Sequence, residues 1–545
     1  MFSYEQRPKI KQLMSNYHFD VLVIGGGITG AGIALDAASR GLSVALVEMQ
    51  DFSEGTSSRS TKLVHGGLRY LKNLEVNVVA EVGREREIVY ENGVHITTPE
   101  HMLLPLYKKG TYGPLATSVA LKVYDRLAGV KKEERRTMLT KKQTLALEPL
   151  LKEKDIRGGG YYVEYRTDDA RLTIEVLKKA VEYQALCLNY AKATEFMYDK
   201  KNKVTGAQIQ DMLHGDTFDI TATQVINATG PWVDAVRNKD VVDNNKQLRL
   251  TKGVHIVIDQ AVFPLHQAVY FDTPDGRMVF AIPRDGKAYV GTTDTFYDKD
   301  PKNPVATAED VTYLLHTIHD MFPDVQVTAK DVESTWAGVR PLIYEKGKDP
   351  SEISRKDEIW LSKNGLMTIA GGKLTGYRQM AEDIVDRVVK LHKFKHAQQC
   401  VTKHLTLSGA NGLNSKNFTQ YVENKAKEGE ALGISYERAK NIVSTYGTNV
   451  DDVFMYLRAL RHEESELPKC LQAKLLYAIN HEMVYTPADF FIRRTGMLYF
   501  AINKVERYKK AVIDVMNKMI KYRPDELAQY TAQLDAAIDA AKHPQ

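Results

Sequence analysis

The feature that most restricts the fold of this chain is a glycine-rich turn between an apolar strand and a helix. Residues 21–24 (Val-Leu-Val-Ile) form a continuous apolar run, and three glycines at 25–27 follow it directly. Residues 28–40 carry small and apolar side chains at helical spacing, and a second apolar run follows at 43–47. This order of segments is typical of a β-α-β unit with buried parallel strands.

Within this unit, Gly25, Gly27 and Gly30 have the spacing of a dinucleotide-binding turn. Glycines at these positions let the backbone approach a pyrophosphate, whose charge faces the N-terminus of the following helix. Glu48 ends the second strand, where a carboxylate accepts hydrogen bonds from ribose hydroxyls. The pattern predicts a dinucleotide site but does not separate FAD from NAD.

Length, charge and cysteine usage exclude several other classes of protein. The 545 residues suggest about three domains. The longest uncharged apolar segment, 21–35, is too short and too rich in glycine to span a membrane, and no secretory signal precedes Asp20. The three cysteines are far apart and form no C-x-x-C pair, so we expect no disulfide framework, no metal site and a reducing, cytoplasmic setting.

The excess of basic over acidic residues is only +5, which does not imply a nucleic-acid partner. We interpret the basic residues between Arg507 and Arg523 as a solvent-facing surface rather than a nucleic-acid site. A second basic stretch, Lys122 to Lys142, has apolar neighbours and could rest on anionic lipid, with a plain solvated surface as the alternative.

The rest of the chain is predicted to contain a second sheet and a helical domain. Alternating segments at 278–282 and 288–291 favour a largely antiparallel sheet. Leu366 to Ala370 is predicted as a strand, and Thr375 to Leu391 as the helix after the Gly371-Gly372 turn. From about residue 400 the pattern becomes helical, and Pro524 fits the first turn of the last helix.

A polar block between Thr56 and Tyr70 is rich in hydroxyl groups and also contains Lys62, His65 and Arg69. Hydroxyl and backbone N–H groups suit phosphates and the edge of a flavin ring. An ordinary polar loop with a hydrogen-bonded histidine is the alternative for this block taken alone.

Taken together, six segments in this order closely resemble the FAD-dependent glycerol-3-phosphate dehydrogenases. The segments are 20–48, 56–71, Asn227 to Trp232, Gly291 to Asp294, Gly338 to Leu342 and Gly371 to Thr375. The resemblance implies an α/β fold, with a glutathione-reductase or D-amino-acid-oxidase-type FAD domain interleaved with an antiparallel-sheet substrate domain, plus an α-helical C-terminal domain. We assign 18–80, 155–235 and 335–395 to the FAD domain, 81–154 and 236–334 to the substrate domain, and 400–545 to the helical domain.

The resemblance also implies that sn-glycerol 3-phosphate is oxidised to dihydroxyacetone phosphate, with electrons passed through FAD to a membrane quinone. It implies a cytoplasmic protein bound peripherally to the inner face of the membrane; a homodimer is an assembly that the sequence leaves open. The alternatives are an α-glycerophosphate oxidase that uses O₂, a non-catalytic nucleotide-binding sensor and, from the glycine fingerprint alone, a nicotinamide dehydrogenase.

The family's basic phosphate-binding residues correspond to Arg69, Arg340 and Lys373, with Tyr70 beside them and Arg355 as a further candidate. Arginine offers a two-pronged donor to a phosphate dianion. The cofactor-binding candidates are Gly25, Gly27, Gly30, Glu48, Thr56, Ser57, Lys62, Leu63, Thr229, Gly230, Gly371, Gly372, Lys373, Leu374 and Thr375.

Oxidation of a secondary alcohol removes a hydride from carbon and a proton from oxygen, so the site needs a base. Histidine titrates in the appropriate range. We predict His65 as this base, with Arg340 polarising the developing carbonyl. His255 is the second candidate, and the alternative, an ordinary strand histidine in the sheet that covers the site, is at least as well supported.

Overall fold

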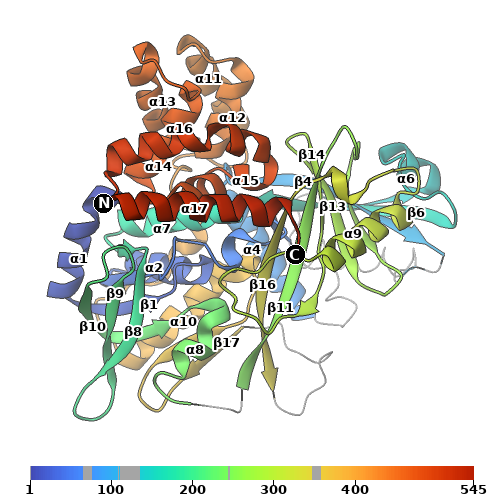
Figure 1. Ribbon diagram of the computed structural model, residues 1–545. Helices are drawn as coiled ribbons and strands as arrows, with labels where there is room; N and C mark the ends of the chain where they lie inside the picture. Colours follow the sequence, from blue (N-terminus) through green and yellow to red (C-terminus); the bar gives the residue numbers. More distant parts are fainter. Residues whose placement is uncertain (1, 66–75, 109, 111–134, 243–245, 346–356) are drawn as a thin grey trace.

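The computed structural model describes residues 2–65, 76–108, 110, 135–242, 246–345 and 357–545. Figure 1 shows three parts: a parallel sheet flanked by helices, a second sheet beside it, and a group of helices lying against both. The N-terminal arm forms helix α1 (Arg7–Asn16).

The first sheet contains the predicted β-α-β unit. Its strands lie in the order β17-β18-β10-β1-β2-β7, and the pairs from β18 to β7 are parallel. A hairpin, β8 and β9, extends β10 antiparallel. The strands are β1 (His18–Ile24), β2 (Val44–Val47), β7 (Leu186–Leu188), β8 (Ala191–Tyr198), β9 (Val204–Asp211), β10 (Thr217–Asn227), β17 (Glu358–Leu361) and β18 (Met367–Ala370).

Helix α2 (Ile28–Ser39) is buried along almost its whole length because it lies against β1 and β2 and contacts two further helices, α7 (Asp169–Glu182) and α10 (Tyr377–His392). A helix buried on every side needs small residues, which explains its run of Gly and Ala. Two other helices accompany this part of the chain: α4 (Val76–Asn92) and α8 (Val233–Arg237).

The second sheet is mostly antiparallel, in the order β15-β11-β14-β13-β12-β4-β6-β3, with β16 on β11 and β5 on β6. Helices α6 (Lys141–Leu147) and α9 (Ala308–Met321) accompany it. Its strands are β3 (Leu63–Val64), β4 (Thr97–Tyr107), β5 (Thr137–Thr140), β6 (Ile156–Thr167), β11 (Lys246–Asp259), β12 (Ala268–Asp272), β13 (Met278–Arg284), β14 (Lys287–Gly291), β15 (Thr295–Phe296) and β16 (Val332–Glu345).

Strands β6 and β16 pair within the second sheet, although we assigned residues 155–167 and 335–345 to the FAD domain. Both strands belong to the second sheet over their whole length, so the chain returns to the first part only after β6 and after β16. Local sequence patterns mark such a position poorly. The domain boundaries stay predictions.

The C-terminal part is helical, as predicted. Its helices are α11 (Phe418–Ala431), α12 (Tyr436–Tyr446), α13 (Val450–Ala459), α14 (Lys469–His481), a π-helix (Asp489–Arg494), α15 (Met497–Phe500), α16 (Ile502–Ile520) and α17 (Pro524–Lys542). One hydrophobic cluster contains side chains of these helices and of the second sheet, among them Val512, Tyr499 and Trp336. The helical part therefore shares a core with the sheet instead of standing apart from it.

Candidate active site

The turn between β1 and α2 forms one wall of a cavity. Gly25 has a φ of +115°, and a Cβ there would lie 2.5 Å from the carbonyl oxygen of Ala228. A Cβ on Gly30 would overlap the carbonyl oxygen of Gly25. Both positions therefore require glycine. Helix α2 consequently begins directly against β1, and Gly27, which precedes the helix, lines the cavity with its first residues, Ile28 and Thr29.

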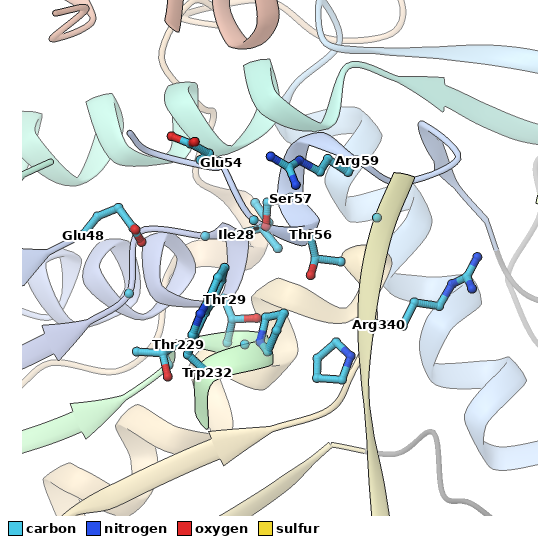
Figure 2. Close-up of a pocket in the computed structure, with 18 of the residues that line it drawn as sticks. Ile28, Thr29, Glu48, Glu54, Thr56, Ser57, Arg59, Thr229, Trp232 and Arg340 are labelled. Atoms are coloured by element: carbon cyan, nitrogen blue, oxygen red, sulfur yellow. Dashed lines mark hydrogen bonds between the residues drawn. The ribbon is translucent and has the colours of Figure 1, made fainter. Parts of the chain in front are cut away.

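Glu48 and Ser57 face this turn from the neighbouring chain segments (Figure 2). The Glu48 carboxylate accepts hydrogen bonds from the N–H groups of Gly26 at 2.7 Å and Gln50 at 2.9 Å. Burial raises the pKa of Glu48 to about 7, although both hydrogen bonds favour the charged form. The N–H of Ile28 donates to Ser57 Oγ at 2.9 Å. These contacts fix the acid and the hydroxyl around the N-terminus of α2.

The cavity has a volume of about 620 Å³, which falls within the usual range for cofactor pockets. Thirteen of the fifteen predicted cofactor residues line it: Gly25, Gly27, Glu48, Thr56, Ser57, Leu63, Thr229, Gly230, Gly371, Gly372, Lys373, Leu374 and Thr375. The glycine turn, the hydroxyls and Glu48 lie along one wall of the cavity. This lining fits a dinucleotide, whose pyrophosphate suits the glycine turn and whose ribose hydroxyls suit the Glu48 carboxylate.

The same cavity also contains the four described residues predicted for substrate or catalysis: His65, His255, Arg340 and Lys373. They come from different parts of the chain, since His65 follows β3, His255 lies on β11, Arg340 on β16 and Lys373 after β18. The structure thus brings together residues more than 300 positions apart in sequence.

Arg340 lies opposite Thr251 of β11, and 31% of its side chain is exposed. Its Nη2 donates to Thr292 Oγ1 at 2.8 Å, and its Nη1 lies 3.3 Å from Asp294 Oδ1. The Asp294 carboxylate holds one side of the guanidinium. Together these contacts set the direction of the guanidinium. Figure 2 shows the Arg340 side chain projecting from β16.

His255 is only 1% exposed and stacks on Trp336, with ring centroids 4.6 Å apart. Its Nε2 lies 3.0 Å from Thr61 Oγ1. Burial holds the pKa of His255 well below its usual value, and the nearby charges of Arg340 and Lys62 lower it further. The imidazole is therefore neutral at pH 7, in a fixed orientation.

His65 lies at the junction of the two sheets, and the hydroxyl of Thr375 is bound to its backbone. The His65 N–H donates to Thr375 Oγ1 at 3.2 Å, and that hydroxyl donates to the His65 carbonyl at 3.1 Å. The ring lies edge-on to Phe280, at 5.8 Å between centroids. Thr375 thereby links the segment carrying His65 to the segment carrying Lys373.

Two predicted cofactor residues do not line the cavity. Gly30 faces β1, as its close approach to Gly25 requires. Lys62 is buried, and its ammonium group donates to Asp169 Oδ1 at 2.7 Å and to the Ser58 carbonyl at 3.0 Å. Lys62 therefore ties the loop before β3 to helix α7, and its charge is directed at a protein carboxylate.

Three predicted substrate residues, Arg69, Tyr70 and Arg355, lie outside the described residues, as does most of the basic stretch from Lys122 to Lys142. Conversely, the cavity lining includes Arg59 and Trp232, and Asp294 holds Arg340, although none of these was among our site candidates. All three belong to segments that we singled out in the sequence, so their place in these motifs was the signal that could have identified them. What the sequence lacked was the direction of each side chain.

Among the described residues, no group of three or more His, Cys, Asp or Glu side chains is arranged to hold a metal ion. No helix in the part of the chain that the structure describes is both long enough and apolar enough to cross a membrane.

Comparison with known proteins identifies the family. The model of the FAD-dependent oxidoreductases matches residues 20–378, and that of the C-terminal domain of alpha-glycerophosphate oxidase matches 400–527. The chain is 59% identical over 539 residues to an aerobic glycerol-3-phosphate dehydrogenase of Staphylococcus haemolyticus, covering 98% of this chain and 97% of that protein. The chain belongs to the aerobic glycerol-3-phosphate dehydrogenases.

Other members and structures agree with this assignment. An aerobic glycerol-3-phosphate dehydrogenase of Staphylococcus aureus is 58% identical, over 99% of this chain and 97% of the relative. The crystal structure of the Bacillus halodurans glycerol-3-phosphate dehydrogenase complexed with FAD is 46% identical, with a TM-score of 0.87 over 100% of this chain and 99% of that one. The predicted family, fold class and FAD cofactor are confirmed.

An L-alpha-glycerophosphate oxidase of Mycoplasma pneumoniae shares only 19% identity, with a TM-score of 0.56, over 69% of this chain and 95% of that one. This likeness shows the common fold and nothing about the electron acceptor.

The raised pKa of Glu48 predicts a pH dependence of stability. The pKa of Glu48 is about 7 in the folded chain, compared with the ordinary value of 4.5 expected in the unfolded chain. Between these values the folded state binds more protons than the unfolded state, so the contribution of Glu48 to stability falls as the pH rises from about 5 to about 7. Urea unfolding of the apoprotein should show this fall in the wild type, and Glu48→Gln should show a flatter profile. Parallel profiles for the two proteins would contradict the assignment.

Proposed function

We propose that this protein oxidises sn-glycerol 3-phosphate at C2 to dihydroxyacetone phosphate and passes the electrons through FAD to a membrane quinone. The observation that carries the proposal is that His65, Arg340 and Lys373 line the same cavity as the dinucleotide-binding turn. Cations beside a cofactor site favour an anionic substrate, and a phosphate dianion suits them. The relatives' names agree with this substrate.

The two cations have separate tasks in this proposal. Lys373 precedes α10 and the short turn Leu374–Gly376, where its positive charge is unfavourable to the helix dipole and favourable to a bound anion. Arg340, held by Asp294 and Thr292, binds substrate and donates a hydrogen bond to the C2 oxygen as it becomes a carbonyl. Arg69, Tyr70 and Arg355 are proposed as further phosphate ligands.

FAD, when bound, supplies a two-electron acceptor for the hydride that leaves C2. His65 takes the proton of the C2 hydroxyl on its imidazole and releases it after the product leaves. His255 suits this task less well, because burial keeps its ring neutral at pH 7 and disfavours the protonated form. We assign His255 a substrate-orienting role through its neutral ring.

We further propose peripheral contact with the inner face of the membrane, where the quinone is found. A homodimer is compatible with this contact. Lys122 to Lys142 is the candidate contact, because basic residues with apolar neighbours attract anionic lipid. An oxidase that reduces O₂ is not favoured, since the relatives that match nearly the whole chain are dehydrogenases.

The first experiment is an anaerobic visible spectrum of the purified protein before and after addition of glycerol 3-phosphate. We expect a flavin absorption band that bleaches with the substrate, recovers quickly with a soluble quinone and slowly with air. Fast recovery in air with release of peroxide would move the assignment to the oxidase. A flavin band that does not bleach would refute the substrate.

Replacing the proposed base should separate chemistry from cofactor binding. We expect His65→Asn to lower turnover by about 10²- to 10⁴-fold, the usual contribution of a general base, while the FAD content stays at the wild-type level. Stopped-flow bleaching and the ratio of flavin to protein absorbance measure the two quantities. His255→Asn is assayed beside it. Near-normal turnover of His65→Asn, with a large loss in His255→Asn, would transfer the role of base to His255.

Membrane contact predicts that the protein binds vesicles containing anionic lipid and that added salt weakens this binding. Co-sedimentation with anionic and with neutral vesicles measures it. Equal binding to both kinds of vesicle would count against the basic stretch as the contact.

A further inference from the structure

A buried group of charges joins the helical C-terminal part to the cofactor cavity. Asp51, in the segment after β2, is fully buried, and its carboxylate is bound by two consecutive arginines of the π-helix. Arg493 Nε lies 2.6 Å from Asp51 Oδ2, while Arg494 Nη1 and Nη2 lie 2.8 and 2.9 Å from its two oxygens. This contact spans more than 440 positions of the sequence.

Hydrogen bonds and one ion pair lead from this contact to the cavity wall. The N–H of Asp51 donates to Glu54 Oε2 at 3.1 Å, and Arg493 Nη2 lies 3.4 Å from the same oxygen. The other oxygen of Glu54 accepts from Gln50 Nε2 at 3.0 Å, and the Gln50 N–H donates to Glu48 at 2.9 Å. Glu48, Gln50 and Glu54 all line the cavity, and Figure 2 shows Glu48 and Glu54 on the cavity wall.

Further contacts within the helical part hold both arginines in place. Asp489, in the same π-helix, lies 2.7 Å from Arg493 Nη2 and also accepts from the hydroxyl of Tyr190 at 2.6 Å. Arg494 Nη2 donates to the carbonyl of Glu482 at 2.9 Å. Arg493 and Arg494 are 3% and 2% exposed, so water does not compete for their donors. A π-helical turn often marks a functional position, and here it directs two neighbouring side chains at one carboxylate.

Electrostatics explains why the cofactor site needs these cations. Glu48, Asp51 and Glu54 place three acids within seven residues, beside the turn that receives a pyrophosphate. Burial would raise the pKa of Asp51, but the charges of Arg494 and Arg493 outweigh it and lower that pKa to about 2. Without the arginines, buried carboxylates would repel one another and the anionic cofactor, and the segment would rearrange to reach water.

We propose that Arg493 and Arg494 are positioning residues of the FAD site: by binding Asp51 they hold the segment 48–57 in its cofactor-binding shape. Docking of the helical part and binding of FAD then stabilise each other, because a coupling free energy between two sites is reciprocal. This inference concerns the cofactor site and goes beyond the proposed substrate and electron acceptor.

The test measures FAD affinity in Arg493→Met. We expect its dissociation constant for FAD to rise by about 10- to 100-fold, within the range usual for coupled sites. Titration of the full-length apoprotein with FAD, followed by flavin fluorescence, gives the value. Arg493→Lys keeps a positive charge near Asp51, so its dissociation constant for FAD should lie between those of wild type and Arg493→Met. If Arg493→Met does not fold, Arg493→Lys serves as the test variant in its place.

Lys178→Met is the matched control. Lys178, on α7, donates to the hydroxyl of Tyr477 on α14, so this variant removes a cation from the same interface without touching Asp51 or Glu54. We expect a lower melting temperature and an FAD dissociation constant within about twofold of wild type. FAD affinities that fall equally in Lys178→Met and in the Arg493 variants would show a purely structural role and overturn the proposal.

Hydrogen exchange tests the reciprocal effect. FAD should slow amide exchange in peptides covering residues 482–500 of the wild type and of Lys178→Met, and this slowing should be absent from Arg493→Met and reduced in Arg493→Lys. If FAD leaves exchange in these peptides unchanged in the wild type, the helical part is not coupled to the cofactor and the proposal fails.

Discussion

The close approach of helix α2 to strand β1 is the contact on which the rest of the cofactor site depends. It exists only because Gly25 and Gly30 lack side chains, since a Cβ on Gly30 would overlap the carbonyl oxygen of Gly25. The approach fixes where the first N–H groups of α2 point, and Ser57 and Glu48 are then bound to Ile28 and Gly26 of the same turn. The cavity wall around this turn follows from backbone geometry, and the side chains of Glu48 and Ser57 complete it.

The positions of Arg340 and His255 depend on a different constraint, the register of two long strands. Strand β11 pairs with β16 so that Thr251 faces Arg340 and His255 faces Trp336. A slip of one residue would turn each of these side chains to the other face of the sheet. Burial of strand residues in the two hydrophobic clusters holds this register, so the position of Arg340 in the cavity is set by packing along the strands as well as by its own contacts.

How much of the fold and of the candidate site could be predicted from the sequence depended on how far apart in sequence the interacting residues lie. The β-α-β unit and the start of α17 at Pro524 were correct because local spacing and Pro or Gly signals determine them. The helix predicted from Thr375 begins instead at Tyr377, because Leu374–Gly376 forms a separate 3-10 turn. The partner of Lys62 is Asp169, 107 positions away, and nothing local distinguishes a lysine that binds a phosphate from one that binds a carboxylate. The contact between Asp51 and Arg494 was invisible for the same reason.

The helical part packs beside two residues of the cavity lining, Glu54 directly and His255 through Trp336, and this argues that it is part of the cofactor-binding unit. Near Asp51 the contact is ionic. Near His255 it is aromatic, because Trp336 stacks on His255 and lies 5.2 Å from the ring of Tyr499 in α15, while the Ser334 hydroxyl donates to the Tyr499 carbonyl at 2.6 Å. The ammonium of Lys62 lies over the rings of both Trp336 and Tyr499, at 5.7 and 5.8 Å from their centroids. A shift of the helical part would therefore disturb the segment that carries Glu48 and the buried ring of His255 together. Two such contacts, chemically unlike and beside different residues of one cavity lining, are difficult to explain for an appended domain that only adds stability.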